Sequence, residues 1–408
     1  MDIYAVRKLL FLTLFCIVLF EGEASATNYY VDGPNPIAND TNSGTEASPW
    51  KTPYAWINKV KAGDTVFVKN GTYTITGGDW NTPALNPVNS GTSTAPIVFK
   101  NYPGHSPKLA GSGSGKAVIG TQNRNYIHVI GFDIDNGRMV VDGAEFTKVL
   151  GFVAKNNRLH GASCPDDFNC TVLWIEDVDG VTLANNTFYN VHGLNDHWNA
   201  AAMIIYHARN MLIENNEFYD LSNGVFFKVD VRNSTIRYNW FHGPRLKRAI
   251  SLLSMSTRTG DKHANNLVYG NIIQDATYAT TELLADTSSP NEDSKIYNNT
   301  FANSFRGIFS DRDLTRFEIY NNIFYKTPNS IDPGDPSWSF CNYNLTFESG
   351  TVCGANSIQN TDPLFVSTAA SKPADFKLKC ESPAIKKGRS GENIGAYATG
   401  AEVIGVIP

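Results

Sequence analysis

A short word recurs through the middle of this chain and limits how the chain can fold. It consists of one or two asparagines followed, one or two residues later, by an apolar residue, as in YNNTF and YNNIF. The last asparagine of each copy is residue 157, 186, 216, 239, 271, 299 or 322, so the intervals are 29, 30, 23, 32, 28 and 23 residues. A period of this length predicts a solenoid, in which each unit buries its apolar face by stacking on its neighbours.

The content of each repeat indicates which kind of solenoid it builds. Between the words lie short runs such as VTLAN, MLIEN and FEIYN, which are rich in β-branched and aromatic residues. Such runs are typical of strands, and none is long enough for the 3.6-residue periodicity of a helix. We therefore predict an all-β chain folded as a parallel β-helix, with one repeat per coil.

This fold gives the repeated word a structural role. Equivalent residues of successive coils lie about 4.8 Å apart, so an asparagine amide can hydrogen-bond the asparagines above and below it. Asparagine also tolerates the left-handed backbone of a tight bend. We expect an asparagine ladder with stacked, inward-facing phenylalanines beside it. A stripe of asparagines that binds glycan is the alternative interpretation.

The first 26 residues are typical of a secretory signal peptide. Arg7 and Lys8 precede the apolar run LLFLTLFCIVLF, and the small residues at 24–26 suit cleavage after Ala26. The run is short for a membrane span, so we expect a secreted or periplasmic protein without one. The net charge of −5 shows no excess of basic residues of the kind that is typical of nucleic-acid-binding proteins.

Cysteine usage fits export from the cytoplasm. Five cysteines follow the leader, and the simplest disulfides pair Cys164 with Cys170 and Cys341 with Cys353, which leaves Cys380 free. The spacing offers no Cys-x-x-Cys pair for a structural zinc site. We therefore expect disulfide bonds and no cysteine-bound metal.

With these features the chain resembles the right-handed, single-stranded parallel β-helix of secreted bacterial polysaccharide-active proteins. YYVDG, GTEASPWKT and AGDTVFVKNGTYT within 29–74 look like the opening cap of that class. DPLF, SPAIKKG and NIGAY within 362–397 look like its closing segment. The resemblance implies a single domain over residues 27–408, with an N-terminal cap and a C-terminal closing segment, which we expect to be a monomer.

An alignment of the strands by their apolar pairs places polar residues in one column on the outer face of one sheet. MVVD, LWIE, MIIYH and VFFK end at Asp142, Glu176, His207 and Lys228. Lys228 follows two phenylalanines, and a lysine desolvated in this way can act as a base because its pKa falls. The column is therefore the predicted working face.

This chemistry suits β-elimination of a uronic-acid polymer. The reaction needs a base for the C5 proton, an acid for the leaving oxygen and a group that neutralises the substrate carboxylate. We predict Lys228 as the base and Arg248 as the carboxylate clamp or proton donor. His207 is a reserve acid or base, and Tyr206 is a candidate donor to the leaving group.

Further candidates surround these residues. The substrate-binding candidates have basic side chains on the same coils; they are Arg245, Lys247, Arg258 and His197. The metal candidates offer carboxylate oxygens, which Ca²⁺ prefers; they are Glu176 and Asp196.

The stretch FFKVDVRNSTIRYNWF, followed by RAISLL and NNLVYGNII, resembles the alginate lyase and chondroitinase B group of β-helix lyases. The resemblance implies a basic lysine, an arginine one coil later and Ca²⁺ held by acidic and amide ligands. The chain departs from that pattern in two ways. Leu221, Asn223 and Val225 stand where acidic residues are expected before the lysine, and Ser254 stands where the arginine is expected.

We predict a lyase acting on an acidic polysaccharide. A glycoside hydrolase on the same scaffold would instead need two carboxyl groups beside the scissile bond; Asp286, Asp311 and Asp313 are its candidates. A non-catalytic glycan-binding protein would use the coil only as a rigid platform. A uronan epimerase would resemble the lyase in chemistry, because it also removes the C5 proton.

Overall fold

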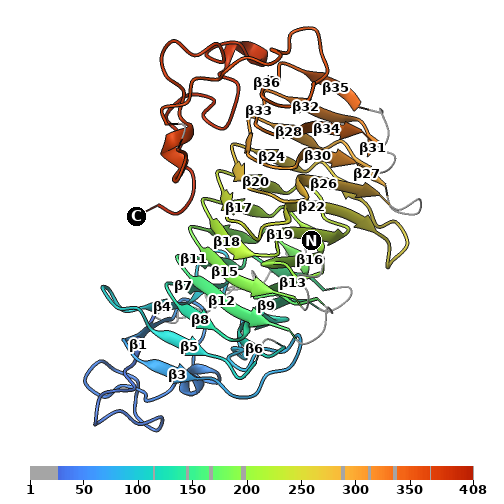
Figure 1. Cartoon of the computed structure of the whole chain (residues 1–408). Helices are drawn as coiled ribbons and strands as arrows, with labels where there is room; N and C mark the ends of the chain where they lie inside the picture. The colour runs from blue at the N-terminus through green and yellow to red at the C-terminus, as the bar shows by residue number, and fades with distance from the viewer. Residues whose placement is uncertain are drawn as a thin grey trace, which may run out of the picture.

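The structure is a computed structural model of the 408-residue chain. It describes residues 26–113, 115–143, 147–164, 169–193, 199–285, 290–310, 314–333, 338–367 and 369–407. Within these residues the chain winds into stacked coils, and the strands form three long sheets that run along the coil axis (Figure 1).

Most coils contribute one strand to each of the three sheets, which we call the first, second and third sheets. Strand pairing within all three sheets is parallel, as in β13 with β16 and β14 with β17. The predicted parallel β-helix is therefore confirmed.

The first sheet has twelve strands among the described residues. They are β1 (Asn28–Val31), β2 (Thr65–Val68), β4 (Ile97–Asn101), β7 (Ile127–Ile130), β11 (Val153–Lys155), β14 (Thr182–Ala184), β17 (Leu212–Glu214), β20 (Thr235–Arg237), β24 (Leu267–Tyr269), β28 (Lys295–Tyr297), β32 (Phe317–Tyr320) and β35 (Trp338–Asn342).

The second sheet has ten strands in the described part of the chain. They are β6 (Ala117–Gln122), β9 (Arg138–Asp142), β10 (Val149–Leu150), β13 (Leu173–Asp179), β16 (Met203–Arg209), β19 (Asn223–Val229), β22 (Arg248–Met255), β26 (Ala279–Ala285), β30 (Arg306–Ser310) and β34 (Asn329–Pro333). It carries the candidate site.

The third sheet has eleven strands over the same described ranges. They are β3 (Thr72–Thr74), β5 (Lys108–Ala110), β8 (Asp133–Asp135), β12 (Arg158–Ser163), β15 (Thr187–His192), β18 (Glu217–Leu221), β21 (Trp240–His242), β25 (Ile272–Gln274), β29 (Thr300–Ala302), β33 (Ile323–Tyr325) and β36 (Leu345–Phe347).

The remaining elements are short. They are the strands β23 (His263–Ala264), β27 (Asn291–Glu292) and β31 (Leu314–Thr315), and the 3-10 turns η1 (Pro53–Trp56), η3 (Pro373–Phe376) and η4 (Arg389–Gly391). No helix among the described residues is long and apolar enough to span a membrane.

The asparagine ladder forms as predicted and is fully internal. The side-chain amide of each asparagine donates to the amide oxygen of the next at 3.0–3.1 Å. The members are Asn157, Asn186, Asn216, Asn239, Asn271, Asn299, Asn322 and Asn344. Their side chains are at most 1% exposed, so they cannot serve as a glycan-binding stripe.

The ladder asparagine of each word and the residue before it have different roles. We expected one asparagine both to form the left-handed bend and to make the ladder hydrogen bond. The first position takes the left-handed backbone, with φ of 57° at Asn156 and Asn185. The second position makes the ladder. Tyr238 and Gly270 stand at the first position in their coils and also have positive φ, so only the ladder position requires asparagine.

Aromatic side chains fill the interior beside the ladder. The Phe188 and Phe218 rings stack at 4.9 Å between centroids, and Phe218 and Phe241 stack at 4.3 Å. All three are fully buried. The predicted stack of inward-facing phenylalanines is therefore confirmed.

The disulfide prediction is also confirmed. Cys164 pairs with Cys170, Cys341 pairs with Cys353, and Cys380 is free and exposed. The two bridges join residues that are 6 and 12 positions apart in the chain.

Replacing Asn239 with alanine should lower the free energy of unfolding by about 3 kcal/mol, because several buried polar groups lose their partner. The Oδ1 of Asn239 accepts from the backbone of Asn216 at 2.9 Å, and its Nδ2 donates to Ile213 O and Asn271 Oδ1 at 3.0 Å each. Urea denaturation measures the loss. The exposed Asn356 provides the control, and an Asn239→Ala protein as stable as Asn356→Ala would contradict the structural role.

Candidate functional site

A row of polar side chains crosses successive coils on the outer face of the second sheet, in the green part of the ribbon in Figure 1. Strand pairing sets Asp142 of β9 beside Glu176 of β13, and Glu176 beside Tyr206 of β16. Lys228 of β19 follows in the next coil. We call Asp142, Glu176, Tyr206 and Lys228 the polar row. Because neighbouring strands are about 4.8 Å apart, the row brings carboxyl, phenol and amine groups close together.

Lys228 occupies a bulge in this row. Ile205 pairs with Phe227, but the next residue, Tyr206, pairs with Val229, so Lys228 is an extra residue in β19. A bulge redirects a side chain and is frequent beside active sites. The bulge explains how Lys228 departs from the regular register of the coils.

The Lys228 amine is enclosed by amide oxygens. Nζ donates to Asn169 Oδ1 at 2.6 Å and to Asn199 Oδ1. Burial lowers the pKa of Lys228 to about 8. Asn169 directly precedes Cys170, which is bonded to Cys164. The sequence prediction of a desolvated lysine agrees with this environment.

An aromatic surface adjoins the amine. The Tyr206 ring stacks on Trp174 at 5.0 Å, and Trp174 contacts Trp80 edge-on at 5.6 Å. The Lys228 Nζ lies 6.0 Å from the centroid of Tyr206, and the Arg138 guanidinium lies 3.8 Å from that of Trp80. Aromatic walls with a few polar groups are typical of ligand sites.

The two carboxyl groups of the polar row hold their protons unusually strongly. Burial and the neighbouring Glu176 raise the pKa of Asp142 to about 7, with a smaller contribution from Asp177. Burial, followed by the charge of Asp177, also raises the pKa of Glu176. Near neutral pH one of these carboxyl groups can therefore serve as an acid.

Beside the polar row the coils turn through a column of left-handed residues. Asp177, His207 and Asp230 have φ of 48°, 46° and 48°. His207 therefore stands one position beyond the polar row, and Tyr206 takes the place that the strand alignment gave to His207. The alignment was wrong by one residue in this coil because MIIYH includes the corner residue, whereas LWIE ends before it.

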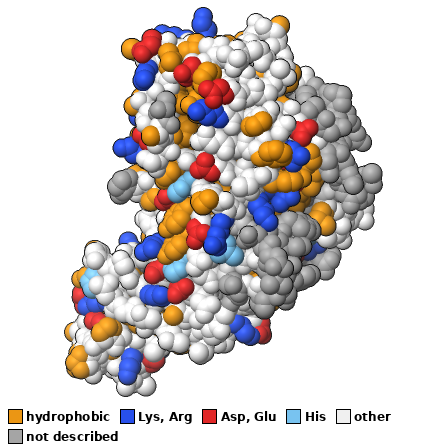
Figure 2. Space-filling model, viewed as in Figure 1, with side chains coloured by type: hydrophobic (Ala, Val, Ile, Leu, Met, Phe, Trp, Pro, Cys, Tyr) orange, Lys and Arg blue, Asp and Glu red, His pale blue; other side chains and the backbone are white. Residues whose placement is uncertain are grey.

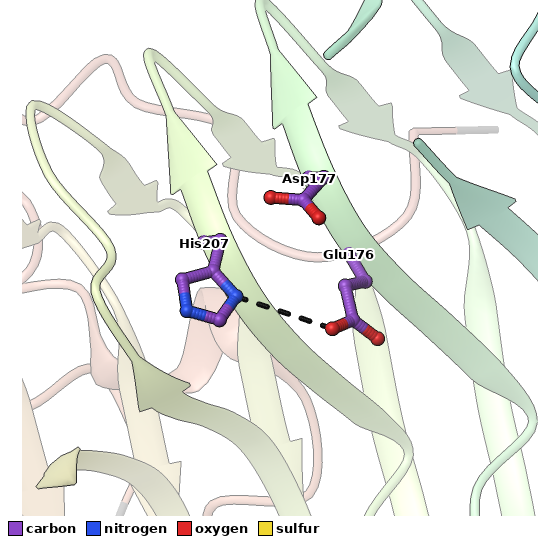
Figure 3. A group of neighbouring side chains, drawn as sticks. All are labelled: Glu176, Asp177 and His207. Carbon is purple, nitrogen blue, oxygen red and sulfur yellow. Dashed lines mark ion pairs between the residues drawn. The ribbon is translucent and has the colours of Figure 1, made fainter. Parts of the chain in front are cut away.

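At this corner Glu176, Asp177 and His207 converge (Figure 3). Their ligand atoms lie within 4.8 Å of one another, and His207 Nδ1 lies 4.0 Å from Glu176 Oε1. Burial, and then the charge of Arg258, lower the pKa of His207. The imidazole is therefore neutral at neutral pH and can act as a ligand.

The segment after β22 braces this corner. Arg258 makes a bidentate ion pair with Asp177, at 2.7 Å and 2.9 Å. Asp261 accepts the Arg258 backbone N–H at 2.6 Å and lies 3.5 Å from His207 Nε2. Arg258 was predicted to bind substrate, but its guanidinium here holds an internal carboxylate.

Glu176, one of the two predicted Ca²⁺ ligands, belongs to this cluster. Calcium takes six to eight oxygen ligands, whereas the described cluster offers two carboxyl groups and a histidine nitrogen. Asp196, the other predicted ligand, lies outside the described residues, so calcium binding through that residue stays a prediction.

Arg248 lies away from the polar row. It pairs in register with Asn223, five residues before Lys228, which corresponds to about 16 Å along a strand. Its Nε contacts Glu282 at 2.9 Å, and its guanidinium lies 4.1 Å from the Tyr278 ring. The structure does not bring the predicted clamp to the predicted base.

The remaining basic candidates lie in the turn that precedes β22. Arg245 is exposed and contacts His192 at 3.2 Å and Asp220 at 3.8 Å. Lys247 is half-buried in the same turn. On the face drawn in Figure 2, basic and acidic side chains are interspersed. His197, Asp286, Asp311 and Asp313 lie outside the described residues.

Sequence reasoning missed several residues that build the site. Asn169 and Asn199 hold the Lys228 amine, and Asp261 supports His207. Asp177 lies in DVDG, which reads as an ordinary turn. An acidic residue followed by a second acidic residue at the end of a strand was the available signal for Asp177, whereas no local pattern marks the two asparagines.

Comparisons with known proteins agree with this architecture. Residues 171–352 match the family model described as the right handed beta helix region. An uncharacterized protein, YwoF, of Bacillus subtilis strain 168 is 27% identical over 158 residues, which are 36% of this chain and 31% of YwoF. The chain thus aligns with about a third of that relative's length.

Solved structures extend the likeness to most of the chain. Pectate lyase Pel9A has a TM-score of 0.60 and 14% identity, covering 92% of this chain and 97% of its own. A rhamnogalacturonan lyase has a TM-score of 0.54 and 14% identity, covering 87% and 95%. A polygalacturonase from Erwinia carotovora ssp. carotovora has a TM-score of 0.50 and 13% identity, covering 83% and 96%. The predicted resemblance to right-handed β-helix polysaccharide lyases is confirmed as a likeness of fold.

The buried lysine should make stability depend on pH in a defined direction. The folded-state pKa of Lys228 is about 8, whereas its ordinary value is 10.5, so the unfolded chain binds more protons between these values. The free energy of unfolding should therefore rise with pH over this window, by up to about 3 kcal/mol. Below pH 8 the amine is charged in both states, and the full cost of burying that charge lowers stability.

Urea unfolding of the natural protein and of Lys228→Met at pH 7 and pH 10 measures this difference. The natural protein should gain stability relative to the variant as the pH rises. The exposed Lys61 provides the matched control in Lys61→Met. A difference between the natural protein and Lys228→Met that does not change with pH would show that the amine is not desolvated.

Proposed function

We propose that the protein cleaves an acidic, uronic-acid-containing polysaccharide by β-elimination, with Lys228 as the base that removes the C5 proton. The observation that carries the proposal is the buried Lys228 amine, whose pKa is lowered to about 8 beside an aromatic surface. A base is most effective when its pKa lies near the working pH. Lys228 meets this condition, whereas an exposed lysine does not.

The contacts of Lys228 support this role. Two amide oxygens, from Asn169 and Asn199, accept hydrogen bonds from Nζ. These acceptors fix the position of the amine. Once neutral, the amine offers a lone pair to the substrate proton.

Tyr206 is the proposed donor to the leaving oxygen. Burial, and then the charge of Glu176, raise the pKa of Tyr206 to about 12, while a hydrogen bond with Asn169 opposes this shift. The phenol therefore keeps its proton at neutral pH and can donate it. Asn169 contacts both Tyr206 and Lys228, so one side chain orients the proposed acid and the proposed base.

The proposed function does not include the role predicted for Arg248, which was to clamp the substrate carboxylate. The position of Arg248 and its ion pair with Glu282 argue for a structural role, and we leave it out of the reacting site. Arg258 is likewise engaged with Asp177. The proposed reaction contains no step that uses calcium.

The solenoid face, the aromatic side chains beside Lys228 and the disulfides support an extracellular glycan as substrate. A solenoid presents long faces that suit linear polymers, and the Trp174 and Tyr206 rings form an apolar wall beside Lys228. The two disulfides favour an oxidising compartment, so we place the protein in the secreted or periplasmic space. The lyases named among the similar folds add support by analogy.

A glycoside hydrolase is the second candidate, and one observation favours it. Asp142 and Glu176 are paired across neighbouring strands, and two carboxyl groups side by side are the catalytic pair that a glycosidase needs. The raised pKa values of both groups suit an acid. In that mechanism Lys228 would only bind the substrate.

Lys228→Ala should reduce lyase activity by about 10²–10⁴-fold, because general-base catalysis contributes that much. The assay follows ultraviolet absorbance of the unsaturated product with alginate, polygalacturonate, chondroitin sulfate and heparin. Lys61→Ala is the control for loss of one positive charge. A Lys228→Ala protein with full activity would exclude Lys228 as the base.

The same assays separate the two candidate reactions. New reducing ends without ultraviolet absorbance would indicate hydrolysis, and activity should then depend on Asp142 and Glu176. Asp142→Asn and Glu176→Gln preserve side-chain shape, so they test the carboxyl groups without opening a cavity. Absorbance that persists in both variants and disappears in Lys228→Ala supports elimination.

A further inference from the structure

We propose that Glu176, Asp177 and His207 form a binding site for a divalent transition-metal ion such as Zn²⁺, and that the site prefers such ions to Ca²⁺. The three side chains converge at the corner beside the polar row (Figure 3). The proposal concerns binding and does not depend on the lyase or hydrolase reaction.

The first support is a buried imidazole nitrogen that lacks a hydrogen-bond partner among the described residues. The His207 side chain is 6% exposed. No described group hydrogen-bonds its Nδ1, and Glu176 Oε1 lies 4.0 Å away. That distance is too long for a hydrogen bond, and an unsatisfied buried polar atom is costly. A cation between the two atoms would satisfy both.

The second support is the orientation of the imidazole. His207 Nε2 lies 3.1 Å from Thr257 Oγ1, and that hydroxyl donates to Asp261 Oδ2 at 3.3 Å. The Thr257 oxygen therefore accepts the Nε2 proton, which leaves a lone pair on Nδ1 directed at Glu176. Metal-binding histidines are commonly held in this way, by a hydrogen bond from the nitrogen that does not bind the metal.

The third support is charge. Glu176, Asp177 and Asp261 supply three negative charges when ionised, and Arg258 supplies one positive charge in its ion pair with Asp177. These carboxyl groups surround the imidazole, and such a surrounding favours a cation over an anion. The Glu176 side chain is 26% exposed, so an ion can reach the site from solvent.

The donor set decides between ions. Imidazole with carboxylate suits zinc and its neighbours in the first transition row, whereas calcium selects oxygen ligands. In a tetrahedral zinc site with bonds of about 2.0–2.2 Å, two ligand atoms lie about 3.4 Å apart. The 4.0 Å separation of His207 Nδ1 and Glu176 Oε1 is therefore slightly long, and a small side-chain movement closes it. Asp177 completes the set through an oxygen that it shares with Arg258.

Titration calorimetry on the chelator-treated full chain tests the proposal, with ZnCl₂, MnCl₂ and CaCl₂ added in separate experiments. We expect one Zn²⁺ per chain, bound more tightly than Ca²⁺. His207→Ala and Glu176→Gln should each weaken Zn²⁺ binding at least tenfold. The matched control is His242→Ala, because His242 also faces a carboxylate, Glu217, but at 3.0 Å and on another sheet.

Circular dichroism checks that each variant is folded, and Glu176→Gln keeps the test valid if His207→Ala does not fold. Absence of Zn²⁺ binding to the natural protein would overturn the proposal. Tighter binding of Ca²⁺ than of Zn²⁺, or equal Zn²⁺ affinity in the natural protein and Glu176→Gln, would also overturn it. Because the readout is binding, failure here is distinguishable from failure of the proposed enzymatic activity.

Discussion

The hydrogen bonds between successive coils are the constraint on which the rest of the structure depends. Successive coils pair strand to strand in the sheets, and the buried asparagine amides repeat the same contact from Asn157 to Asn344. A buried amide without a partner is costly, so a coil cannot slip against its neighbour without losing these bonds. The ladder therefore fixes the register of the sheet that carries the candidate site.

Fixed register places chemically different side chains next to one another at strand spacing. Asp142, Glu176 and Tyr206 lie in consecutive coils, and the bulge adds Lys228. Burial shifts the pKa values of the carboxyl groups upward and that of the lysine downward. Burial disfavours the charged forms of these groups, so burying them lowers the free energy of unfolding. It also brings their pKa values closer to neutral pH.

The corner beside the row shows how two neighbouring sites can share residues. Glu176 belongs to the polar row and also faces His207, while Arg258 and Asp261 hold the corner from a segment that begins 81 residues after Asp177 in the chain. An ion bound at Glu176 would alter the electrostatics of Tyr206, whose pKa already responds to that carboxylate. Metal binding and glycan chemistry would then be coupled through one side chain.

The sequence by itself determined the coil, the ladder, the phenylalanine stack and the disulfide pairs, because each depends on a spacing that repeats or on near neighbours in the chain. It also predicted a desolvated Lys228, since two adjacent phenylalanines indicate local burial. The register at Tyr206 and His207, the amides of Asn169 and Asn199, and the separation of Arg248 from Lys228 were decided only by tertiary structure. A bulge shifts the register without a local signature, and contacts across 29 or 59 residues depend on how the coils stack.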